Sequence, residues 1–344
     1  MMTSRSQEAL PRRRFTRPGK ARGSVSIVLT AISVLLLLVG VLAPHTGGGK
    51  LPVLYLLVAF HSLFMVGVTA FTLLAVIVVA ALRWRWVTIV IALIALVASV
   101  SVMVPSLNRS PRVEPARVAS SGAGTLRVLE WNTGEQDVDT TVLQTLIKQT
   151  DPNIIVLPEY FTQLAKGTLA DVAKQRDMQI LGWNGSSATA LISRSLGNYR
   201  VDHSGTPPWA GFVAVPANPQ SPRLVITHLQ RPSLTSTSLW REHVEWAAAQ
   251  CQQGTIAVGD FNATAPNINP STKLGKCSDS AAALGESPQG TWPTALPGSL
   301  GATIDHVFVG PGWKAAAFSV LDGLDEAGSD HRPTFAVVTP ARRT

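Results

Sequence analysis

The stretch "TIAVGDFNATAPN", from Thr255 to Asn267, joins a core strand to a polar pair. Four residues suited to a buried strand, Ile256 to Gly259, lead directly into Asp260, and a carboxamide follows two positions later at Asn262. A carboxylate at the end of a buried strand needs partners that offset its desolvation. The stretch therefore predicts that other polar groups gather around this strand end.

Five further segments place acids, amides or imidazoles at or beside strands in the same way. They are "LRVLEWN" with Asn132, "NIIVLPEY" with Glu159, "RLVITHL" with His228, "ATIDHVF" with Asp305 and His306, and "EAGSDHRPTFAVV" with Asp330 and His331. Each alone has an ordinary explanation as a turn cap or a satisfied core group. Six such strand ends together indicate that these groups are one another's partners.

The chemistry open to this set is narrow. Carboxylate and amide oxygens without a thiolate cluster suit Mg²⁺, Mn²⁺ or Ca²⁺ better than zinc. Such a metal polarises a phosphoryl oxygen and stabilises a leaving oxyanion. An Asp steered by an amide can deprotonate water, and a His backed by a carboxylate can hold charge on a phosphate. The pattern predicts metal-assisted hydrolysis of a phosphate ester.

Charge and hydropathy divide the 344 residues into two parts. Residues 1–104 hold ten of the 29 basic residues and one of the 21 acidic ones, so they carry +9 and residues 105–344 carry −1 of the net charge of +8. The basic balance therefore gives no support for nucleic-acid binding by the C-terminal part. From the composition we expect a basic cytoplasmic tail at 1–23, three transmembrane helices within 24–104, a linker at 105–124 and a catalytic domain at 125–344.

Three apolar runs approach or exceed the roughly 20 residues that cross a bilayer. They are Ser24 to Ala43, Leu51 to Leu82 and Val87 to Val104. The middle run has two interpretations, one long tilted helix or a helix with an interfacial start near Pro52. Basic residues before the first run and in "RWR" at 83–85 predict a cytoplasmic N-terminus, a multi-pass protein of the cell membrane and an extracytoplasmic C-terminal domain. Signal-peptide cleavage after Ala43 is an alternative that leaves this domain on the same side.

Both cysteines, Cys251 and Cys277, fall in the domain predicted to be exported. An oxidising compartment allows a disulfide between them, and two buried free thiols are the alternative.

The C-terminal part alternates short Val- and Ile-rich runs with turns and a few helical patterns. The predicted strands are 126–131, 153–157, 189–193, 211–215, 223–227, 255–258, 303–309 and 334–338. The predicted helices are 139–149, 161–176 and 236–252. Because strands outnumber helices, we expect an α+β layered sandwich rather than a regularly alternating parallel fold.

The ordered set "LRVLEWN", "DPNIIVLPEY", "THL", "GDFNA", "TIDHVF" and "GSDHRP" resembles the endonuclease/exonuclease/phosphatase superfamily. That superfamily includes secreted DNases, abasic-site endonucleases, inositol-polyphosphate 5-phosphatases and neutral sphingomyelinases. The resemblance covers about residues 125–340 and implies a DNase I-like, four-layered α/β/β/α sandwich, here preceded by a three-helix transmembrane region. The N-terminal part looks like that of bacterial membrane-tethered members.

The resemblance also implies roles by position. It implies a divalent metal, Mg²⁺ or else Mn²⁺ or Ca²⁺. Glu159 would be a ligand of this metal, and Asn132 would lie beside the metal and its water. Asp330 matches an acid that the family uses for the metal or for water. The implied catalytic residues are Asp260 as activator of the attacking water, Asn262 as its supporting amide, His331 on the scissile phosphate, Asp305 as the carboxylate that orients His331, and His228 as a second phosphate-side imidazole.

Some positions stay open. His306 beside Asp305 is as well explained by a buried structural role as by a catalytic one, and no acid that would orient His228 can be identified. The tryptophans in "TPPWAGF" and "GTWPTALPGS", Trp209 and Trp292, have a core role as their default interpretation, with rims of the site as the alternative.

The sequence thus predicts a membrane-tethered phosphoesterase whose partners are the lipid bilayer and a phosphate-ester substrate. A nucleic acid would require basic and aromatic groups along its path. A tether of about twenty residues favours a phospholipid, and a phosphomonoester stays open. The alternative is a non-catalytic membrane receptor or interaction module that retains the fold, although every matched position keeps its chemistry. Nothing in the sequence predicts an obligate protein partner. A transport function would require ionisable residues within the apolar runs, and His61 is the single candidate there.

Overall fold

The computed structural model describes residues 18–83, 85–115, 124–233 and 235–341. Contacts within the chain divide it into two units, which are described separately. Unit 1 comprises Met1–Leu38 and Gly67–Ser101, and unit 2 comprises Val39–Val66 and Val102–Thr344. Most of the predicted cytoplasmic tail and much of the predicted linker, residues 1–17 and 116–123, lie outside the described residues.

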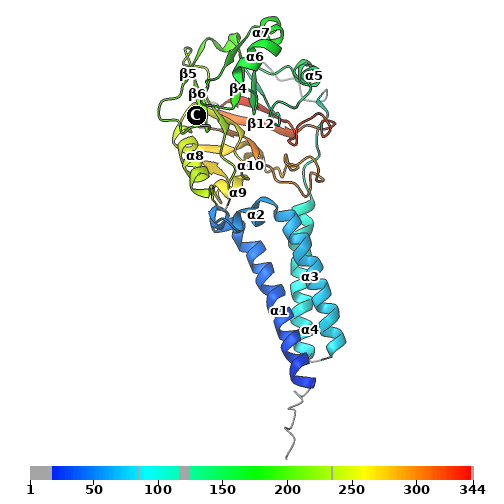
Figure 1. The fold of residues 1–344 in the computed structure, drawn as a ribbon. Coiled ribbons are helices and arrows are strands. Elements are labelled where there is room, and N and C mark those ends of the chain that lie inside the picture. The colour runs from blue at the N-terminus through cyan, green and yellow to red at the C-terminus, as the bar shows by residue number, and fades with distance from the viewer. Residues whose placement is uncertain (1–17, 84, 116–123, 234, 342–344) are drawn as a thin grey trace, which may run out of the picture. The chain divides into compact units, whose positions relative to one another are not determined.

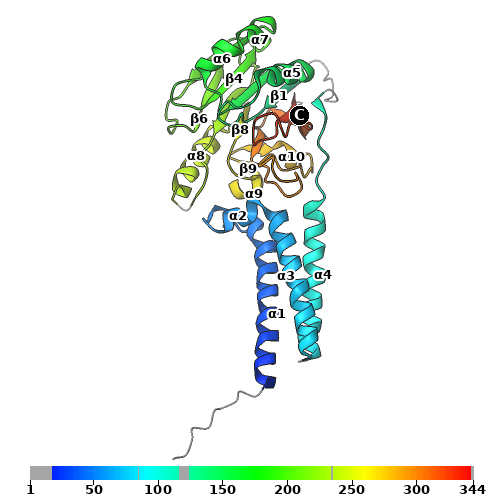
Figure 2. The ribbon, with the colours of Figure 1, turned by 45° about the vertical axis from the view of Figure 1, so that its right-hand side comes forward.

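Three long apolar helices supply unit 1. They are α1 (Pro18–Leu42), α3 (His61–Leu82) and α4 (Trp86–Leu107), and they run side by side in both ribbon views (Figures 1 and 2). The segments long and apolar enough to cross a membrane are Ala21–His45, His61–Leu82 and Trp86–Leu107. The expectation of three helices of spanning length is therefore confirmed.

Most of the buried side chains on these helices are small. Ser33 of α1, Thr72 and Ala75 of α3, and Ala92 and Ser99 of α4 are all at most 1% exposed. Many large aliphatic side chains on the same helices are exposed, although Val68 and Val79 of α3 are buried. This distribution is typical of helices that pack in lipid, where small residues permit close approach and apolar surface is left on the outside.

The middle apolar run is broken rather than continuous. It contains a short helix, α2 (Leu54–Ala59), and the long α3 starts at His61. Two single 3₁₀ turns, Ala43–His45 and Gly48–Lys50, precede α2. Phe60 leaves helical geometry with ψ of 43°, and its ring lies 5.8 Å from that of Trp292. Of the two interpretations of this run, the structure has the separate start: α2 ends at Ala59, and α3 begins at His61.

Unit 2 is built around two mixed sheets. The six-stranded sheet has the order β12-β13-β1-β2-β4-β3, and the seven-stranded sheet has the order β5-β6-β7-β8-β11-β10-β9. The strands of the first are β1 (Leu126–Glu130), β2 (Ile154–Pro158), β3 (Met178–Leu181), β4 (Ala188–Ser193), β12 (Trp313–Val320) and β13 (Thr334–Pro340). Those of the second are β5 (Tyr199–Asp202), β6 (Gly211–Pro216), β7 (Arg223–His228), β8 (Thr255–Asp260), β9 (Lys273–Leu274), β10 (Cys277–Asp279) and β11 (Asp305–Val309).

Three apolar cores separate four layers. Side chains such as Val128, Val156, Ile226 and Val258 fill the space between the two sheets. A second core joins the first sheet to the helices α5 (Thr140–Thr150), α6 (Thr162–Thr168) and α7 (Ala170–Gln175). A third joins the second sheet to α8 (Thr237–Gln250), on the opposite side of the strands (Figure 1). Short helices α9 (Ala265–Ile268) and α10 (Ser280–Ala283) lie in connections. The predicted α/β/β/α sandwich is confirmed.

The predicted elements differ from the observed ones in two respects. The single helix expected over 161–176 is two helices that meet at Leu169, which is fully buried and has non-helical ψ of 9°. Strands β3, β5, β9, β10 and β12 were not predicted. Four of them have two to four residues, and β12 reads "WKAAAFSV", in which alanines replace the β-branched residues that mark strands.

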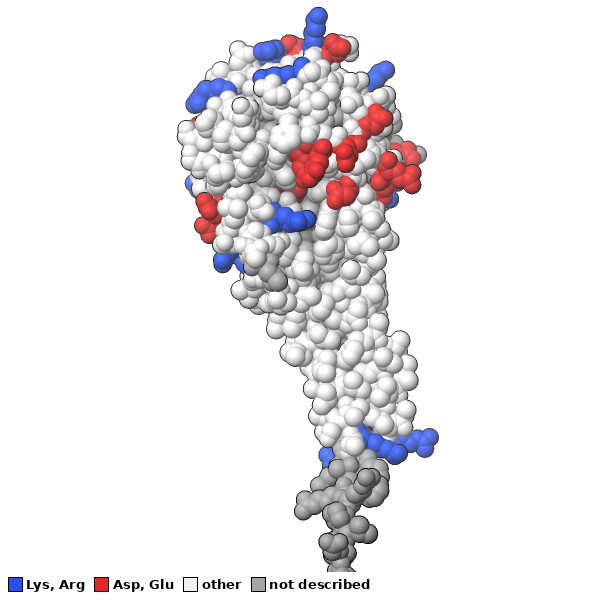
Figure 3. Space-filling model, viewed as in Figure 1, with Lys and Arg blue, Asp and Glu red and all other residues white. Residues whose placement is uncertain are grey.

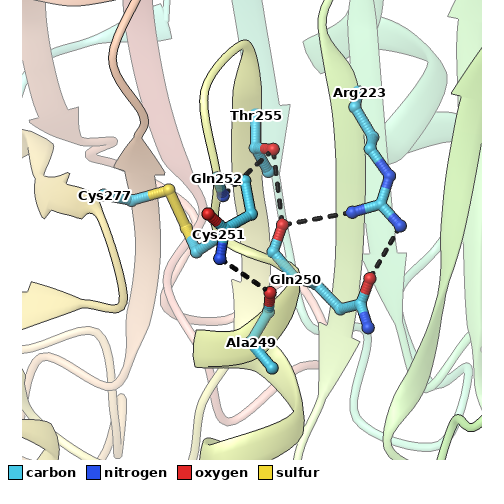
Figure 4. The surroundings of a disulfide bond; sticks show 7 residues. All are labelled: Arg223, Ala249, Gln250, Cys251, Gln252, Thr255 and Cys277. Atoms are coloured by element: carbon cyan, nitrogen blue, oxygen red, sulfur yellow. Dashed lines mark hydrogen bonds between the residues drawn. A yellow bond between two sulfur atoms is a disulfide. The ribbon is translucent and has the colours of Figure 1, made fainter.

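A disulfide links the end of α8 to β10. Cys251 and Cys277 are bonded with their Cα atoms 5.6 Å apart, and both are fully buried. Around them Arg223 donates to the carbonyl and side-chain oxygens of Gln250, and the Gln252 amide donates to the carbonyl of Ala249 (Figure 4). Of the two alternatives for the cysteines, the structure has the bridge.

Candidate active site

Strand register aligns three of the predicted residues. In the parallel pair β7–β8, His228 lies opposite Asp260, and in the antiparallel pair β8–β11, Asp260 lies opposite Asp305. Gly259 has φ of 139°, and a Cβ there would lie 2.0 Å from the carbonyl oxygen of Thr227. Glycine thus permits the tight approach of β7 and β8 immediately before the site, and the three polar residues form a row across one end of the second sheet.

The first sheet brings Asn132 and Glu159 to the same place. Trp131 and Thr133 donate their backbone N–H groups to the carbonyls of Val156 and Pro158, so the chain beyond β1 stays paired with β2 as both strands end. The Asn132 amide Nδ2 lies 3.2 Å from Glu159 Oε1 and 3.0 Å from Asp260 Oδ2. Asn132 therefore links the ends of the two sheets.

A cavity of about 800 Å³ opens over these strand ends. Six of the eight predicted residues line it, and they are Glu159, His228, Asp260, Asn262, Asp330 and His331. Asn132 and Asp305 are fully buried and bond to residues that line the cavity. The structure thus brings all eight into one connected cluster, and the role of each stays a prediction.

Asp260 lies at the centre of the cluster. It is 1% exposed, and its carboxylate accepts hydrogen bonds from the Asn262 backbone N–H at 2.6 Å and from the Asn262 and Asn132 amides. Burial and then the negative charge of Asp305 raise the pKa of Asp260 to about 6. The carboxylate can therefore gain or lose a proton near neutral pH.

Glu159 and His228 form a pair on one side of Asp260. His228 Nε2 lies 3.3 Å from Glu159 Oε1, and the Glu135 backbone N–H donates to Glu159 Oε2 at 2.7 Å. The hydrogen bond with His228, which outweighs burial, lowers the pKa of Glu159 to about 2. Burial opposes protonation of His228, but the bond to Glu159 and the charge of Asp260 raise its pKa above the usual value. This side of the site pairs a carboxylate of lowered pKa with an imidazole of raised pKa.

His331 and Asp305 form a second pair, on the other side. His331 Nδ1 lies 2.9 Å from Asp305 Oδ2, while Nε2 is directed toward Asp260 and Asp330 at 4.0 and 3.9 Å. Although burial opposes it, the charge and hydrogen bond of Asp305 raise the pKa of His331 to about 9. Trp131 Nε1 donates to the His331 carbonyl, which fixes the backbone behind the ring.

Two residues of the cluster have left-handed backbone geometry. Glu159 has φ of 59° and Asn262 has φ of 49°. Both follow a strand that ends at the site, and the turn of the chain is what aims their side chains into the cavity. Such conformations in residues other than glycine are uncommon and concentrate at functional sites.

Sequence reasoning missed a third buried acid. Glu130, the last residue of β1, is fully buried, and Thr334 Oγ1 donates to its Oε2 at 2.8 Å. Burial, and then the charges of Asp305 and Asp260, raise the pKa of Glu130 well above its usual range. This shift favours the neutral form of Glu130 beside the carboxylates of Asp305 and Asp260. Its place in "LRVLEWN", two residues before Asn132, was the available signal.

His228 has a hydroxyl at one ring nitrogen and an acid at the other. Ser187 Oγ lies 2.6 Å from His228 Nδ1, so the hydroxyl and Glu159 occupy the two ring nitrogens. Trp292 Nε1 donates to Asp330 Oδ2 at 2.7 Å, which places this tryptophan beside the site, and Trp209 also lines the cavity. Both tryptophans therefore lie at the rim of the cavity rather than in the apolar core of the domain.

His306, in contrast, is turned away from the cavity. Its Nδ1 lies 2.8 Å from Asp279 and its Nε2 lies 3.0 Å from the carbonyl of Ala263. Neighbours on a strand point to opposite faces, which separates His306 from the adjacent Asp305. A structural role accounts for both ring nitrogens.

The model of the Endonuclease/Exonuclease/phosphatase family matches residues 129–331 of the chain, more than half of its length. No curated protein matches the chain.

Similar solved structures are distant. The endonuclease/exonuclease/phosphatase from Bacteroides vulgatus is 15% identical with a TM-score of 0.49, covering 63% of this chain and 99% of its own. The catalytic domain of human Nocturnin is 14% identical with a TM-score of 0.48, covering 69% and 99%. An AP endonuclease from Archaeoglobus fulgidus is 12% identical with a TM-score of 0.46, covering 61% and 98%.

Proposed function

Because the chain belongs to the Endonuclease/Exonuclease/phosphatase family, we propose that it is a divalent-metal-dependent hydrolase of phosphate esters. The observation that carries the proposal is the row of His228, Asp260 and Asp305 in register across three strands, with Asn132 joining Asp260 to Glu159. Groups held by paired strands keep their relative positions during a reaction, and this favours catalysis.

Asp260 is the proposed base. A pKa of about 6 leaves its carboxylate ionised at neutral pH and still able to accept a proton. In the proposed step the oxygen of a water bonds to phosphorus, the ester P–O bond breaks, and the proton of the water passes to Asp260. Asn262, which donates to Asp260 through both its backbone and its side chain, would hold the carboxylate in place.

The two imidazoles are the proposed phosphate contacts. His331, with Nδ1 on Asp305 and a pKa of about 9, presents a cationic Nε2 toward the cavity at neutral pH. His228 presents Nε2 beside Glu159 from the other side. Positive charge on both sides would stabilise the charge that develops on the phosphoryl oxygens.

Glu159, Asp330 and Asn132 are the proposed metal site. Glu159 and Asp330 line the cavity with carboxylates, and both cysteines of the sequence are bonded to each other, so the donors nearby are the hard oxygens that Mg²⁺, Mn²⁺ and Ca²⁺ prefer. When bound, such an ion would polarise a phosphoryl oxygen and stabilise the leaving oxygen. Asp260, Asp305 and His331 also have ligand atoms within 4.8 Å of one another. In the proposal these residues serve instead as the base and as the His331–Asp305 pair.

A membrane anchor with the site outside the cell completes the proposal. Arg22, Arg83 and Arg85 lie where α1 begins and where α3 joins α4, and Figure 3 shows basic side chains at that end of unit 1. The positive-inside rule favours a cytoplasmic location for that end, and the Cys251–Cys277 disulfide favours an oxidising compartment for unit 2.

The test uses the full-length protein in detergent with bis(p-nitrophenyl) phosphate, in Mg²⁺, Mn²⁺, Ca²⁺ or EDTA. We expect hydrolysis that requires a metal and falls at least a thousandfold in Asp260→Asn, because the base and the centre of the hydrogen-bond network are lost together. Asp171→Asn, which removes an exposed acid on α7, is the matched control and should keep full activity. Metal binding without turnover of this ester or of p-nitrophenyl phosphate would contradict the proposal and favour the non-catalytic receptor.

A further inference from the structure

The cavity over the strand ends has two chemically different walls. One is formed by the polar groups of the proposed catalytic site. The other is apolar and aromatic, and its members are Tyr55, Leu56, Ala59, Phe60, Trp292, Ala302 and Ile304. Four of these seven residues come from α2 and Phe60, the segment between the first two apolar helices. The chain that leads into a candidate membrane span therefore forms one side of the proposed active site.

Specific contacts fix this segment against the sandwich. The Asn267 amide donates to the carbonyls of Gly49 and Tyr55, both at 3.1 Å. Ala59 is 4% exposed and packs with Ala302 and Ile304, and the ring of Tyr55 lies 6.2 Å from that of Trp240. All these residues belong to unit 2, so the apolar wall is part of the same body as the site.

The apolar wall is joined directly in the chain to two candidate membrane spans. If the three helices cross a membrane, this connection places the wall at the membrane surface. Residues 46–60 separate the candidate span that ends at His45 from the one that begins at His61. Phe60, which contacts Trp292, is thus the residue immediately before a span. In the same link Leu51, Val53 and Leu56 are 55%, 67% and 53% exposed. Exposed aliphatic side chains next to a span are suited to the boundary between headgroups and acyl chains.

The charge of the cavity disfavours a long polyanion. Among the described residues that line it, Arg231 is the one lysine or arginine, whereas Glu135, Asp137, Glu159, Asp260 and Asp330 are acidic. Basic side chains form no continuous band across the face drawn in Figure 3. A nucleic-acid backbone needs a row of basic groups along its path, but a single phosphate needs only the metal and the imidazoles.

We propose that the substrate is a phosphate ester of a membrane amphiphile, with its phosphate over Asp260 and its apolar part against the wall formed by α2 and Trp292. This rests on the proposed function and names the substrate class of that site. Leu56, both exposed and lining the cavity, is the residue that determines this specificity. An apolar chain laid along the wall removes its surface from water and adds binding free energy that a short ester lacks.

The experiment compares two esters that share the scissile bond, methyl p-nitrophenyl phosphate and dodecyl p-nitrophenyl phosphate. Full-length protein in nanodiscs is assayed with both, and the quantity compared is the ratio of kcat/KM for the dodecyl ester to kcat/KM for the methyl ester. We expect a ratio of at least about 100 for the wild type and a roughly tenfold lower ratio for Leu56→Ser. Val53→Ser is the matched control, because Val53 is at least as exposed, lies on the same link and does not line the cavity. Its ratio should equal that of the wild type.

The outcomes separate the two proposals. Hydrolysis of the methyl ester with a wild-type ratio near one, or an equal fall of the ratio in Leu56→Ser and Val53→Ser, overturns the lipid inference and leaves the hydrolase standing. Faster cleavage of single-stranded DNA than of the dodecyl ester overturns it as well. Absence of hydrolysis of either ester with every metal overturns the proposed function, and the inference with it.

Discussion

Asp305 and His306 are neighbours on β11, and each belongs to a buried histidine–aspartate pair. The two pairs face in different directions. His331 bonds to Asp305 and keeps Nε2 directed to the cavity, 4.0 Å from Asp260. His306 bonds to Asp279 and has Nε2 on the carbonyl of Ala263. In both pairs burial opposes protonation, but the paired aspartate together with other neighbours raises the pKa of the imidazole. Burial and a carboxylate partner are thus common to both, and the difference is an unoccupied second nitrogen over the cavity.

Among variants of the two pairs, Asp305→Asn should have the largest effect on activity. The amide cannot supply the negative charge that keeps His331 protonated and oriented, so we expect kcat to fall about a thousandfold, within the range for loss of an acid–base or charge-stabilising group. Hydrolysis of bis(p-nitrophenyl) phosphate measures it. A loss of less than fivefold would mean that the His331–Asp305 pair serves the structure and not the reaction, as the His306–Asp279 pair is expected to do.

Asp279→Asn is the counterpart and should act on stability instead. The charge-assisted bond to His306 is weakened, while the bond from the Ala282 N–H that starts α10 can still be accepted. We expect the free energy of unfolding to fall by about 2 kcal/mol. The activity per folded molecule should stay within twofold of the wild type. The midpoint of thermal unfolding and the same assay measure the two. An activity loss as large as that of Asp305→Asn would mean that the His306–Asp279 pair also serves the reaction.

His243 extends the comparison to a buried imidazole without a carboxylate. The Gln230 backbone N–H donates to its Nδ1 at 3.1 Å, and burial, with the charge of His228 second, lowers its pKa to about 4. The unfolded chain, with a pKa of 6.5, binds the proton more readily. The contribution of neutral His243 to the free energy of unfolding is therefore complete above about pH 6.5. It decreases as the pH drops toward 4.

The corresponding variant is His243→Asn, whose side-chain oxygen can accept the same bond without titrating. Between pH 7 and pH 5.5 the wild type should lose about 1 kcal/mol more stability than the variant. Thermal midpoints across this range measure the difference. Parallel pH profiles would mean that His243 does not titrate on unfolding.

The sequence predicted the polar half of the cavity because desolvation restricts what can stand at the end of a core strand. Asp260 after "TIAVG" and Glu159 after "NIIVLP" could be found from this restriction alone. Equally, Val- and Ile-rich runs predicted eight strands and hence the layered fold. The roles of these residues came from the family resemblance, and they need the experiments above.

The apolar half of the cavity could not be predicted, because it depends on contacts between distant parts of the chain. Asn267 holds Gly49 and Tyr55, more than 200 residues away, and nothing in "LPVLYLLVAF" distinguishes a wall of the site from the start of a membrane helix. The serine on His228 was hidden for the same reason, since Ser187 lies 41 residues before it. Alternation alone did not reveal which of Asp305 and His306 bonds to a residue that lines the cavity.

The cystine has a consequence for how the molecule would survive damage. Cys251 and Cys277 close a ring of chain that contains β8, and with it Asp260 and Asn262. A protease that nicks the exposed turn around Thr272, within this ring, would leave two fragments joined through sulfur, and they would separate on a gel only after reduction. The strand would also keep its partners β7 and β11 on either side. For a domain that works outside the cell, as proposed, the ring would protect the strand that carries the base against a single cut.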